Sequence, residues 1–212
     1  MSPACPPLPS THVQFFCTAG PSDPGALAVL SAEEQTRASR FHFDRDRHRW
    51  SRGRAWIRRT LGDQLGMDPA SLRILAEPGG RLFLPDISGF DFNLSHTGDW
   101  IALATCQDGR IGVDLETVDP AFPAQEIARE FFLPEECQWI AAGPVERFFH
   151  LWTAKEALMK ATGRGLSLEP DKIRVTIRDG TPSMVTNLET GATCPVTTGP
   201  GPDGTIAAVV LS

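Results

Sequence analysis

Two strand patterns joined by a tight-turn dipeptide stand at the midpoint of this 212-residue chain. Residues 100–106 are mostly apolar, and residues 111–116 alternate between apolar and acidic side chains toward their end. The Asp108-Gly109 pair between them is preferred in two-residue hairpin turns, so we expect the two strands to pair antiparallel. A boundary here divides the chain into two comparable units of helices and strands, residues 1–105 and 106–212.

Helix and strand patterns occur in both units. Ser31 and Glu34 form a capping box, which predicts that a helix starts there. Longer helical patterns cover residues 44–61 and 146–162, and Gly163 stands where a left-handed residue would close the second one. Shorter helices are expected at 126–132 and 134–142, and further strands at 12–18, 92–96, 173–178 and 205–211. We expect the Gly-, Pro- and Thr-rich segment between the last two strands to be a connection.

The composition is that of an ordinary globular protein. Hydrophobic residues make up 41% of the chain and charged residues 22%, which excludes bulk disorder. No apolar run approaches the ~20 residues that a membrane helix needs, and the N-terminus lacks the pattern of a secretory signal. We therefore expect a cytoplasmic protein with no membrane partner. The five cysteines include no Cys-x-x-Cys pair, so neither a zinc site nor a redox dithiol is indicated.

Arginine is concentrated in one segment although the net charge is -6. The negative balance disfavours a generic nucleic-acid-binding protein. Most arginines of the first half nevertheless lie between residues 37 and 59. This segment is either a solvated helix face or a face that binds phosphate, because the guanidinium fork matches phosphate oxygens.

Asp114 and Glu116 are the first candidates for chemistry. Alternate residues of a strand project to the same side, ~6.6 Å apart, so these two carboxylates repel each other unless a cation neutralises them. Oxygen ligands of this kind suit Mg²⁺, which commonly takes one or two protein carboxylates together with waters and phosphate oxygens. The alternative is a solvated polar face on an edge strand.

A second candidate set lies on the predicted helix over residues 146–162. Glu156 follows Phe149 and Trp152 at helical spacing, so it is expected to face a cleft or the interior, where a carboxylate requires a cation. Lys155 and Lys160 add two positive charges beside it. The alternative is an ordinary surface pair of Glu156 and Lys160. Together with the first set, this pattern indicates a site for a metal-bound polyphosphate.

A third candidate set is Asn93-Leu-Ser-His96, with Arg81 upstream. The Ser95 hydroxyl and the His96 ring can donate hydrogen bonds to phosphate oxygens. Taken alone, a single histidine in a loop is more often merely exposed.

The combination of these motifs resembles the 4′-phosphopantetheinyl transferases of the surfactin-synthetase type. The resemblance covers roughly residues 31–170 and is carried by 93–97, 112–116, 152–160 and 163–166, with Arg40-Phe41 and His48-Arg49 in support. It implies an α+β fold of two similar halves in a pseudo-twofold arrangement, each an antiparallel sheet with a long helix. It also implies the two-unit, monomeric form of the fold, with the active site in the cleft between the halves.

The resemblance further implies transfer of 4′-phosphopantetheine from coenzyme A to a serine of an apo acyl or peptidyl carrier protein, with adenosine 3′,5′-bisphosphate as by-product. Fatty-acid, polyketide and peptide-synthetase carriers all remain open. By this resemblance, Mg²⁺ or Mn²⁺ is bound by Asp114, Glu116 and Glu156, and the catalytic residues are Glu156, as the base, and Lys160. Phosphate is contacted by Lys155 and Lys160, and the 3′-phosphate is bound by Arg49 and His96. The adenylate pocket is lined by Ser95 and Arg81. Arg81 and Arg164 stand where the family often has lysine.

Two rival functions remain. Another Mg²⁺-dependent enzyme, such as a nuclease of the Asp…Glu-x-Lys kind, needs a lysine two residues after a metal-binding glutamate, where this chain has Val118 and Leu158. A non-catalytic nucleic-acid-binding module based on residues 37–59 leaves the acidic residues without a purpose, and it would show steep salt dependence without any dependence on Mg²⁺.

Overall fold

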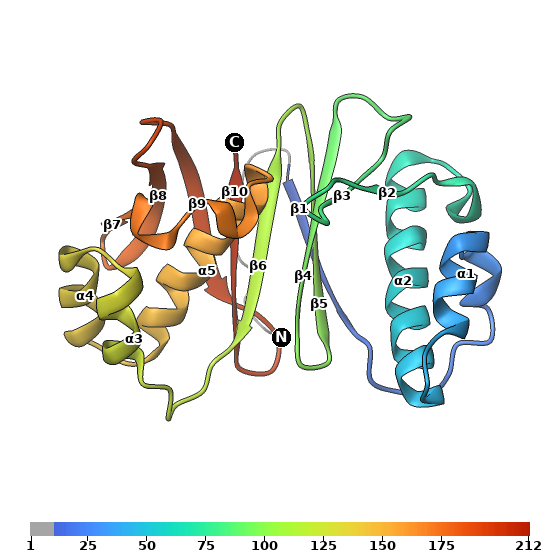
Figure 1. The fold of residues 1–212 in the computed structure, drawn as a ribbon, viewed down its shortest axis with the longest axis horizontal. Helices are drawn as coiled ribbons and strands as arrows, with labels where there is room; N and C mark the ends of the chain where they lie inside the picture. Colours follow the sequence, from blue (N-terminus) through green and yellow to red (C-terminus); the bar gives the residue numbers. More distant parts are fainter. Residues whose placement is uncertain (1–10) are drawn as a thin grey trace.

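The structure is a computed structural model that describes residues 11–212, in which two antiparallel sheets lie side by side with helices at both ends (Figure 1). The first sheet has the order β1-β5-β4, with β1 (Thr11–Cys17), β4 (Phe90–Thr97) and β5 (Trp100–Gln107). The second has the order β6-β10-β9-β8-β7, with β6 (Ile111–Thr117), β7 (Ile173–Arg178), β8 (Thr181–Asn187), β9 (Thr193–Pro200) and β10 (Thr205–Leu211). A small hairpin pairs β2 (Leu75–Ala76) with β3 (Leu82–Phe83).

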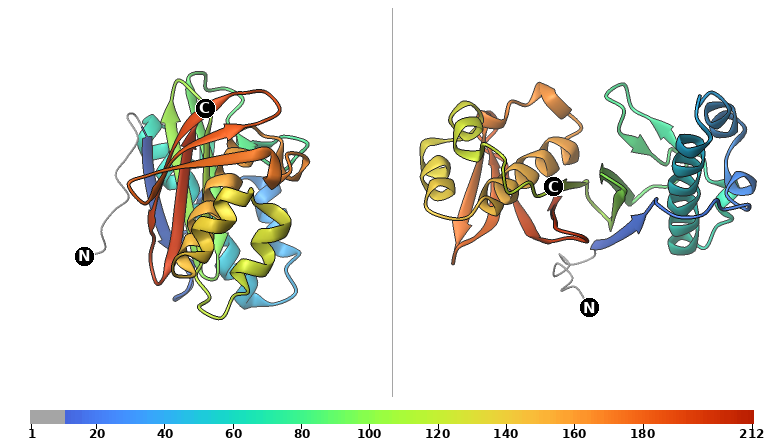
Figure 2. Two further views of the ribbon diagram at one scale, coloured as in Figure 1. Left: turned by 90° about the vertical axis from the view of Figure 1, so that its left-hand side faces the viewer. Right: turned by 90° about the horizontal axis from the view of Figure 1, so that it is seen from below.

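One long helix packs on each sheet, as the α+β fold of two halves requires. In the first half α1 (Ala32–Ser39) lies against α2 (Asp44–Leu65), and in the second α3 (Ala124–Phe131) and α4 (Pro134–Ala141) accompany α5 (Glu146–Ala161). Short 3-10 helices are η1 (Leu27–Val29), η2 (Pro69–Ser71), η3 (Gly165–Ser167) and η4 (Pro170–Lys172). The view from below shows α2 and α5 on opposite sides of the central strands (Figure 2). Within residues 11–212, no helix is both long and apolar enough to cross a bilayer.

The local signals at helix ends act as predicted. Ser31 and Glu34 form both hydrogen bonds of the capping box, and Gly163 has a φ of 70° directly after the residue that caps α5. Helix α2 runs on through Gly62 to Leu65 and ends at Gly66, which has a φ of 65°. It extends past the predicted end because the first of these two glycines keeps helical geometry.

The predicted hairpin at Asp108-Gly109 is wrong. Strand β6 pairs with β10, from Ile111 opposite Leu211 to Thr117 opposite Thr205, and not with β5. Asp108 has a φ of 53°, so the turn chemistry is present, but the chain uses it to pass from one sheet to the other. The Asp-Gly dipeptide predicts a local turn of the chain, but it does not predict which strand pairs with β6.

The segment expected to be a connection between the last two strands contains β8 and β9. Strand β9 lies between β8 and β10. Pro182, Pro195 and Pro200 stand within these strands. Proline lacks an amide donor and usually argues against a strand inside a sheet, which is why the pattern was misleading.

The joint between the two sheets has a polar face made by side chains of β4. Asp91 Oδ2 accepts a hydrogen bond from Ile111 N at 2.8 Å, and Asn93 Oδ1 accepts one from Val113 N at 3.0 Å. Thr97 Oγ1 is 3.3 Å from Thr117 N. Side-chain oxygens of alternate β4 residues therefore take the place that backbone carbonyls have in a normal ladder, and they hold β6 in register.

A glycine brings α5 directly onto β6. A Cβ atom at Gly112 would lie 1.9 Å from Ala157 O and 2.6 Å from Ala161 N, so no larger residue fits without moving the helix. This close approach puts Asp114, two residues along the strand, beside the face of α5 that carries Lys160.

Candidate active site

A cavity of about 830 Å³ lies in the first half, bounded by residues of α1, α2, β2, β4 and the turn after β4. Four of the residues expected to bind coenzyme A line it: Arg49, Arg81, Ser95 and His96. Apolar side chains also line it, among them Trp50, Ile57, Leu82, Phe92 and Ile101. The cavity therefore combines apolar walls with a few basic and polar groups, which is typical of a site for an organic anion.

Arg49 lies at the cavity wall and is held by the first sheet. Its Nε donates to Thr18 Oγ1 at 3.1 Å, it also binds Gly98 O, and its guanidinium pairs with Asp99 at 3.1 Å. The Arg49 side chain is nevertheless 46% exposed. It is therefore both oriented by the protein and accessible to an anion from solvent.

Ser95, Asp114 and Lys160 meet where the two halves join. Ser95 Oγ donates to Asp114 Oδ1 at 2.9 Å, and Lys160 Nζ lies 2.9 Å from Ser95 Oγ and 2.7 Å from Asp114 Oδ1. The three residues come from β4, β6 and α5. Because Ser95 also lines the cavity, this contact connects the cavity to the acidic residues of β6.

The three acidic residues singled out in the sequence interact electrostatically. Burial, together with the charges of Asp114 and Glu156, raises the pKa of Glu116 to about 7, although the charge of Lys160 opposes the rise. Burial also raises the pKa of Glu156, with Asp114 as the next cause. Each of these two carboxyl groups is therefore harder to ionise than usual. A cation bound next to them would favour the ionised form and lower both pKa values.

The fit of these residues to a divalent cation depends on one oxygen of Asp114. Among residues 11–212 no group of three or more His, Cys, Asp or Glu side chains is arranged so that it could hold a metal ion. Asp114 Oδ2, however, is buried and has no hydrogen-bond partner in the part of the chain described. A buried carboxylate oxygen without a protein partner suits Mg²⁺, which commonly completes its shell with water and phosphate oxygens.

Lys155 does not reach this site, which corrects its expected role as a phosphate contact. Its side chain is 1% exposed and pairs with Glu136 of α4 at 2.6 Å. Lys155 Nζ also donates to Pro170 O at 2.9 Å and lies 4.5 Å from the centre of the Phe132 ring. One residue along a helix is a rotation of ~100°, so the neighbour of Glu156 faces α4 and the second core instead.

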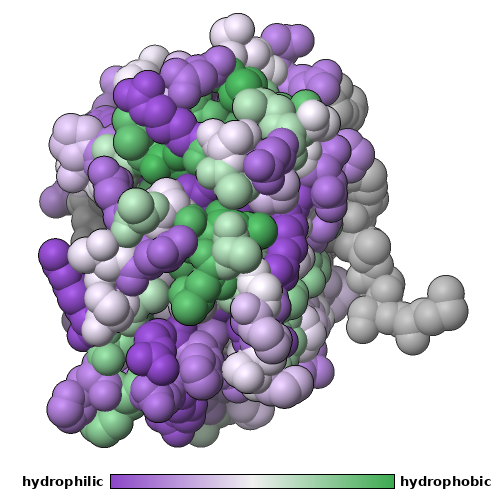
Figure 3. All heavy atoms as spheres, turned by 90° about the vertical axis from the view of Figure 1, so that its right-hand side faces the viewer, coloured by the Kyte–Doolittle hydropathy of each residue, from purple (hydrophilic) through white to green (hydrophobic). Residues whose placement is uncertain are grey.

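Much of the arginine-rich segment is bound within the protein. Arg54 and Arg58 both pair with Glu34, the second at 2.5 Å, and Arg59 pairs with Asp23 at 2.6 Å. The outer surface of this half, seen in Figure 3, mixes hydrophilic and apolar residues. The segment is therefore in part a structural network that anchors α2, with Arg49 as the predicted ligand that faces the cavity.

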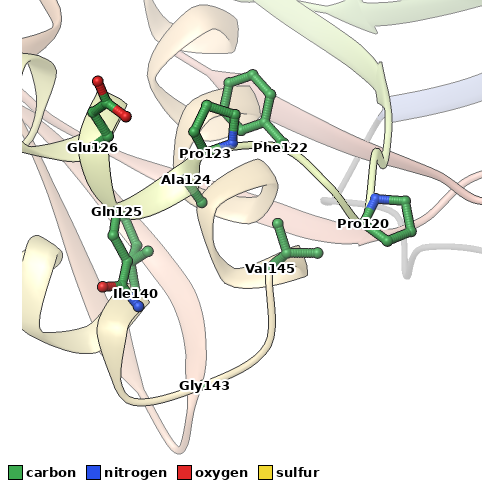
Figure 4. A pocket seen from close by; sticks show the side chains of 9 residues that line it. All are labelled: Pro120, Phe122, Pro123, Ala124, Gln125, Glu126, Ile140, Gly143 and Val145. Atoms are coloured by element: carbon green, nitrogen blue, oxygen red, sulfur yellow. The ribbon is translucent and has the colours of Figure 1, made fainter.

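A second, smaller cavity of about 330 Å³ lies at the start of α3 and beside the turn before α5 (Figure 4). Phe122, Ile140 and Val145 are among its lining residues, and none of the predicted site residues lines it. It shares no lining residue with the cavity that is lined by Arg49 and Ser95.

Sequence reasoning assigned no role to the residues that hold the site together, namely Thr18, Asp91, Asn93, Thr97 and Asp99. A usable signal was present for two of them, Asp91 and Asn93. Residues 90–95 alternate strictly between apolar and polar side chains, which marks one buried and one polar face of a strand. What the pattern does not reveal is that the polar face meets another strand and not solvent.

Two protein-family models match the chain, one in each half. Residues 24–108 match the model described as 4′-phosphopantetheinyl transferase, N-terminal. Residues 110–210 match the model of the 4′-phosphopantetheinyl transferase superfamily.

Curated relatives lead to the same family. The 4′-phosphopantetheinyl transferase HetI of a Nostoc species is 39% identical over 157 residues, which cover 70% of this chain and 66% of the relative. A 4′-phosphopantetheinyl transferase of Bacillus subtilis is 34% identical over 72% of this chain and 69% of its own length. The transferase Sfp of Bacillus subtilis strain 168 is 31% identical over 74% of this chain and 71% of its own length. The matched region thus spans about two thirds of each relative, and the chain belongs to the 4′-phosphopantetheinyl transferase family.

Proposed function

We propose that this chain transfers the 4′-phosphopantetheine group of coenzyme A to a serine hydroxyl of an apo carrier protein. In this reaction the serine oxygen bonds to the β-phosphorus of coenzyme A, and the bond from that phosphorus to the bridging oxygen breaks. Adenosine 3′,5′-bisphosphate leaves with that oxygen, and the serine proton passes to a base of the protein.

The observation that carries the proposal is the contact of Ser95, Asp114 and Lys160. It joins a cavity of about 830 Å³, within the range of ~300–1,000 Å³ usual for ligand sites, to a group of acidic side chains. In coenzyme A the diphosphate joins the adenosine to the pantetheine, so an adenylate bound in the cavity would direct the diphosphate toward the acidic side chains. The carrier serine would approach from the side of the acidic residues.

The first half supplies the groups for the adenylate end. Arg49 is partly exposed and offers a guanidinium for the 3′-phosphate, with His96 as its partner. Ser95 lines the adenylate side of the cavity. A competing anion must displace Asp99 from Arg49, and such an exchange is inexpensive because surface ion pairs contribute only ~0–1 kcal/mol.

The second half supplies the groups for the reaction. Asp114, Glu116 and Glu156 would hold Mg²⁺, or Mn²⁺ in its place, which neutralises charge on the diphosphate when bound. Glu156 is the proposed base for the serine proton, directly or through a bound water. Burial raises the pKa of the Glu156 carboxyl, which makes this group a better proton acceptor near neutral pH. Lys160 Nζ donates to the phosphate and stabilises the charge that develops on the leaving oxygen.

The remaining features of the proposal concern partners and setting. A single chain carries both halves of the site, so we propose that it acts as a monomer. The cytoplasm is the proposed location. Fatty-acid, polyketide and peptide-synthetase carriers are equally compatible with the site. Nucleic acid is not proposed as a partner, because Arg54, Arg58 and Arg59 already pair with carboxylates of the protein.

Mass spectrometry tests the proposal. The protein is incubated with coenzyme A, Mg²⁺ and a panel of apo carrier proteins, and each carrier is weighed. We expect a phosphopantetheine adduct on at least one carrier, and loss of the adduct with Asp114→Ala or with Glu156→Ala. Glu130→Ala, an exposed change on α3, is the matched control and should keep full activity. Full activity of both site variants would refute the assignment of the site, and no adduct on any carrier would refute the function.

A further inference from the structure

Arg81 belongs to the first half but makes two of its side-chain hydrogen bonds with the second. It lies in the β2–β3 hairpin, directly before Leu82, and its side chain is only 5% exposed. Its guanidinium pairs with Asp91 of β4. Arg81 Nη2 also donates to Ile111 O at 2.9 Å, and Nη1 donates to Lys160 O at 3.1 Å.

These acceptors lie at two informative places. Ile111 is the first residue of β6, three residues before Asp114, and its amide is bound by Asp91 at 2.8 Å. Arg81 and Asp91 together therefore hold both the N–H and the C=O of Ile111. The other acceptor is the carbonyl of Lys160 itself, in the last turn of α5.

Arginine is suited to this position for a geometric reason. A guanidinium presents several N–H donors in a rigid plane, so one side chain can bind a carboxylate and two carbonyls that belong to different elements. A lysine ammonium at the same place is a compact point charge on a flexible stem. Both terminal nitrogens of Arg81, Nη1 and Nη2, donate hydrogen bonds in these contacts. Its Nε is buried and has no partner among residues 11–212.

We propose that Arg81 is a positioning residue that fixes β6 and the end of α5 against the donor cavity. This inference rests on the proposed function and replaces the expectation that Arg81 binds the adenylate of coenzyme A. In this role Arg81 sets where Asp114 and Lys160 stand relative to Arg49 and Ser95. Small displacements between reacting groups reduce catalysis strongly, by ~10²-fold for about 1 Å. Loss of Arg81 should thus affect turnover far more than donor binding.

Kinetics and calorimetry of the full chain separate the two roles. We expect Arg81→Met to lower kcat by ~10²-fold and Arg81→Lys by ~10-fold, with the KM and the calorimetric Kd for coenzyme A within about threefold of the wild type. Asp91→Asn should act in the same direction as Arg81→Lys. Arg73→Met removes an exposed arginine of the same half, paired with Asp86 at 3.3 Å, and should change neither constant.

Hydrogen–deuterium exchange tests the same inference without turnover. Arg81→Lys should speed amide exchange in β6 and in the last turn of α5, and leave β7 and β8 as in the wild type. Unchanged exchange in β6 and α5 would overturn the inference even if the wild type transfers no phosphopantetheine. A rise in KM and Kd for coenzyme A at unchanged kcat would overturn it as well, and would assign Arg81 to the donor.

Discussion

Helix α5 contributes the lysine of two lysine–carboxylate pairs, which differ in burial and in whether every carboxylate oxygen has a partner. Lys155 and Glu136 lie 2.6 Å apart and are both buried. Glu136 Oε1 accepts from Val175 N at 2.7 Å, and Oε2 accepts from Leu133 N at 2.9 Å in addition to the lysine. Every oxygen and the ammonium are satisfied by the protein, so this pair is closed.

Lys160 and Asp114 form the open pair, five residues further along the same helix. Their atoms are 2.7 Å apart, but the lysine side chain is 27% exposed and Asp114 Oδ2 has no partner in the described part of the chain. Ser95 is the additional contact of both. A buried carboxylate oxygen without a partner is costly in a folded protein unless it serves a ligand. The comparison teaches that a lysine–carboxylate pair is a structural contact where every oxygen has a partner and a candidate site where one oxygen has none.

The closed pair should give the largest effect on stability. Lys155→Met leaves the Glu136 carboxylate buried without its cation, and we expect a loss of about 3–5 kcal/mol in the free energy of unfolding. Urea denaturation measures it. The double variant Lys155→Met with Glu136→Leu should recover part of the loss, because no charge is then left buried. A loss below about 1 kcal/mol in the single variant would contradict a saturated, buried pair.

The open pair should affect turnover instead. Lys160→Met removes the proposed donor to the phosphate, and we expect kcat to fall by ~10²-fold, equivalent to about 2.7 kcal/mol. The free energy of unfolding should change much less than in Lys155→Met, because Lys160 is in part solvated. Steady-state kinetics and urea denaturation on the same preparations test the contrast. Equal stability losses in the two lysine variants would abolish the distinction between the pairs.

The open site should also impose a pH dependence on stability. The pKa of Glu116 in the folded chain is about 7, above its ordinary value of 4.5, so the folded state binds the proton more tightly than the unfolded state. Stability should therefore fall as the pH rises from about 4.5 to about 7, by at most about 1–3 kcal/mol, and then level off.

Urea denaturation with EDTA between pH 5 and 8 measures that slope. Glu116→Gln, which cannot ionise, should flatten it. Mg²⁺ together with coenzyme A should also reduce it, because a bound cation favours the ionised carboxylate. An unchanged slope in Glu116→Gln would exclude this residue as its source.

The smallest effect is expected at an exposed pair. Arg164 and Glu189 form an ion pair in which both side chains are about two-fifths exposed, at 39% and 40%. We expect Arg164→Ala to change the free energy of unfolding by less than about 1 kcal/mol and to leave kcat unchanged. This variant provides an exposed reference for the closed pair and the open pair. A change as large as that in Lys155→Met would mean that exposure does not separate the classes.

The contrast between the pairs also marks what sequence reasoning resolves. Helical spacing correctly predicted α5, and spacing on a strand put Asp114 and Glu116 on one element, because both patterns are local. The same spacing treated Lys155 and Lys160 as equivalent. Which of them meets solvent is decided by α4, whose Glu136 covers one side of α5, and nothing in the lysine motif reports that packing.

The partner of a strand escaped prediction for the same reason. The turn at Asp108 has the expected local chemistry, yet β6 joins β10 from the far end of the chain. Proline content concealed β8 and β9, although backbone pairing on both sides of β9 is extensive. The fold class followed from the motif resemblance, whereas pairings between distant segments depend on contacts that no short pattern encodes.

The joint between the halves has a consequence for how this chain can change over time. Side chains of β4 grip the main-chain amides of β6, at Ile111, Val113 and Thr117. Every residue except proline carries the same amide N–H, so these three contacts exclude proline but make no other demand on the side chains at those positions. The side chains of β6 thereby remain available for other tasks, which are core packing at Val113 and Leu115 and the acidic groups at Asp114 and Glu116.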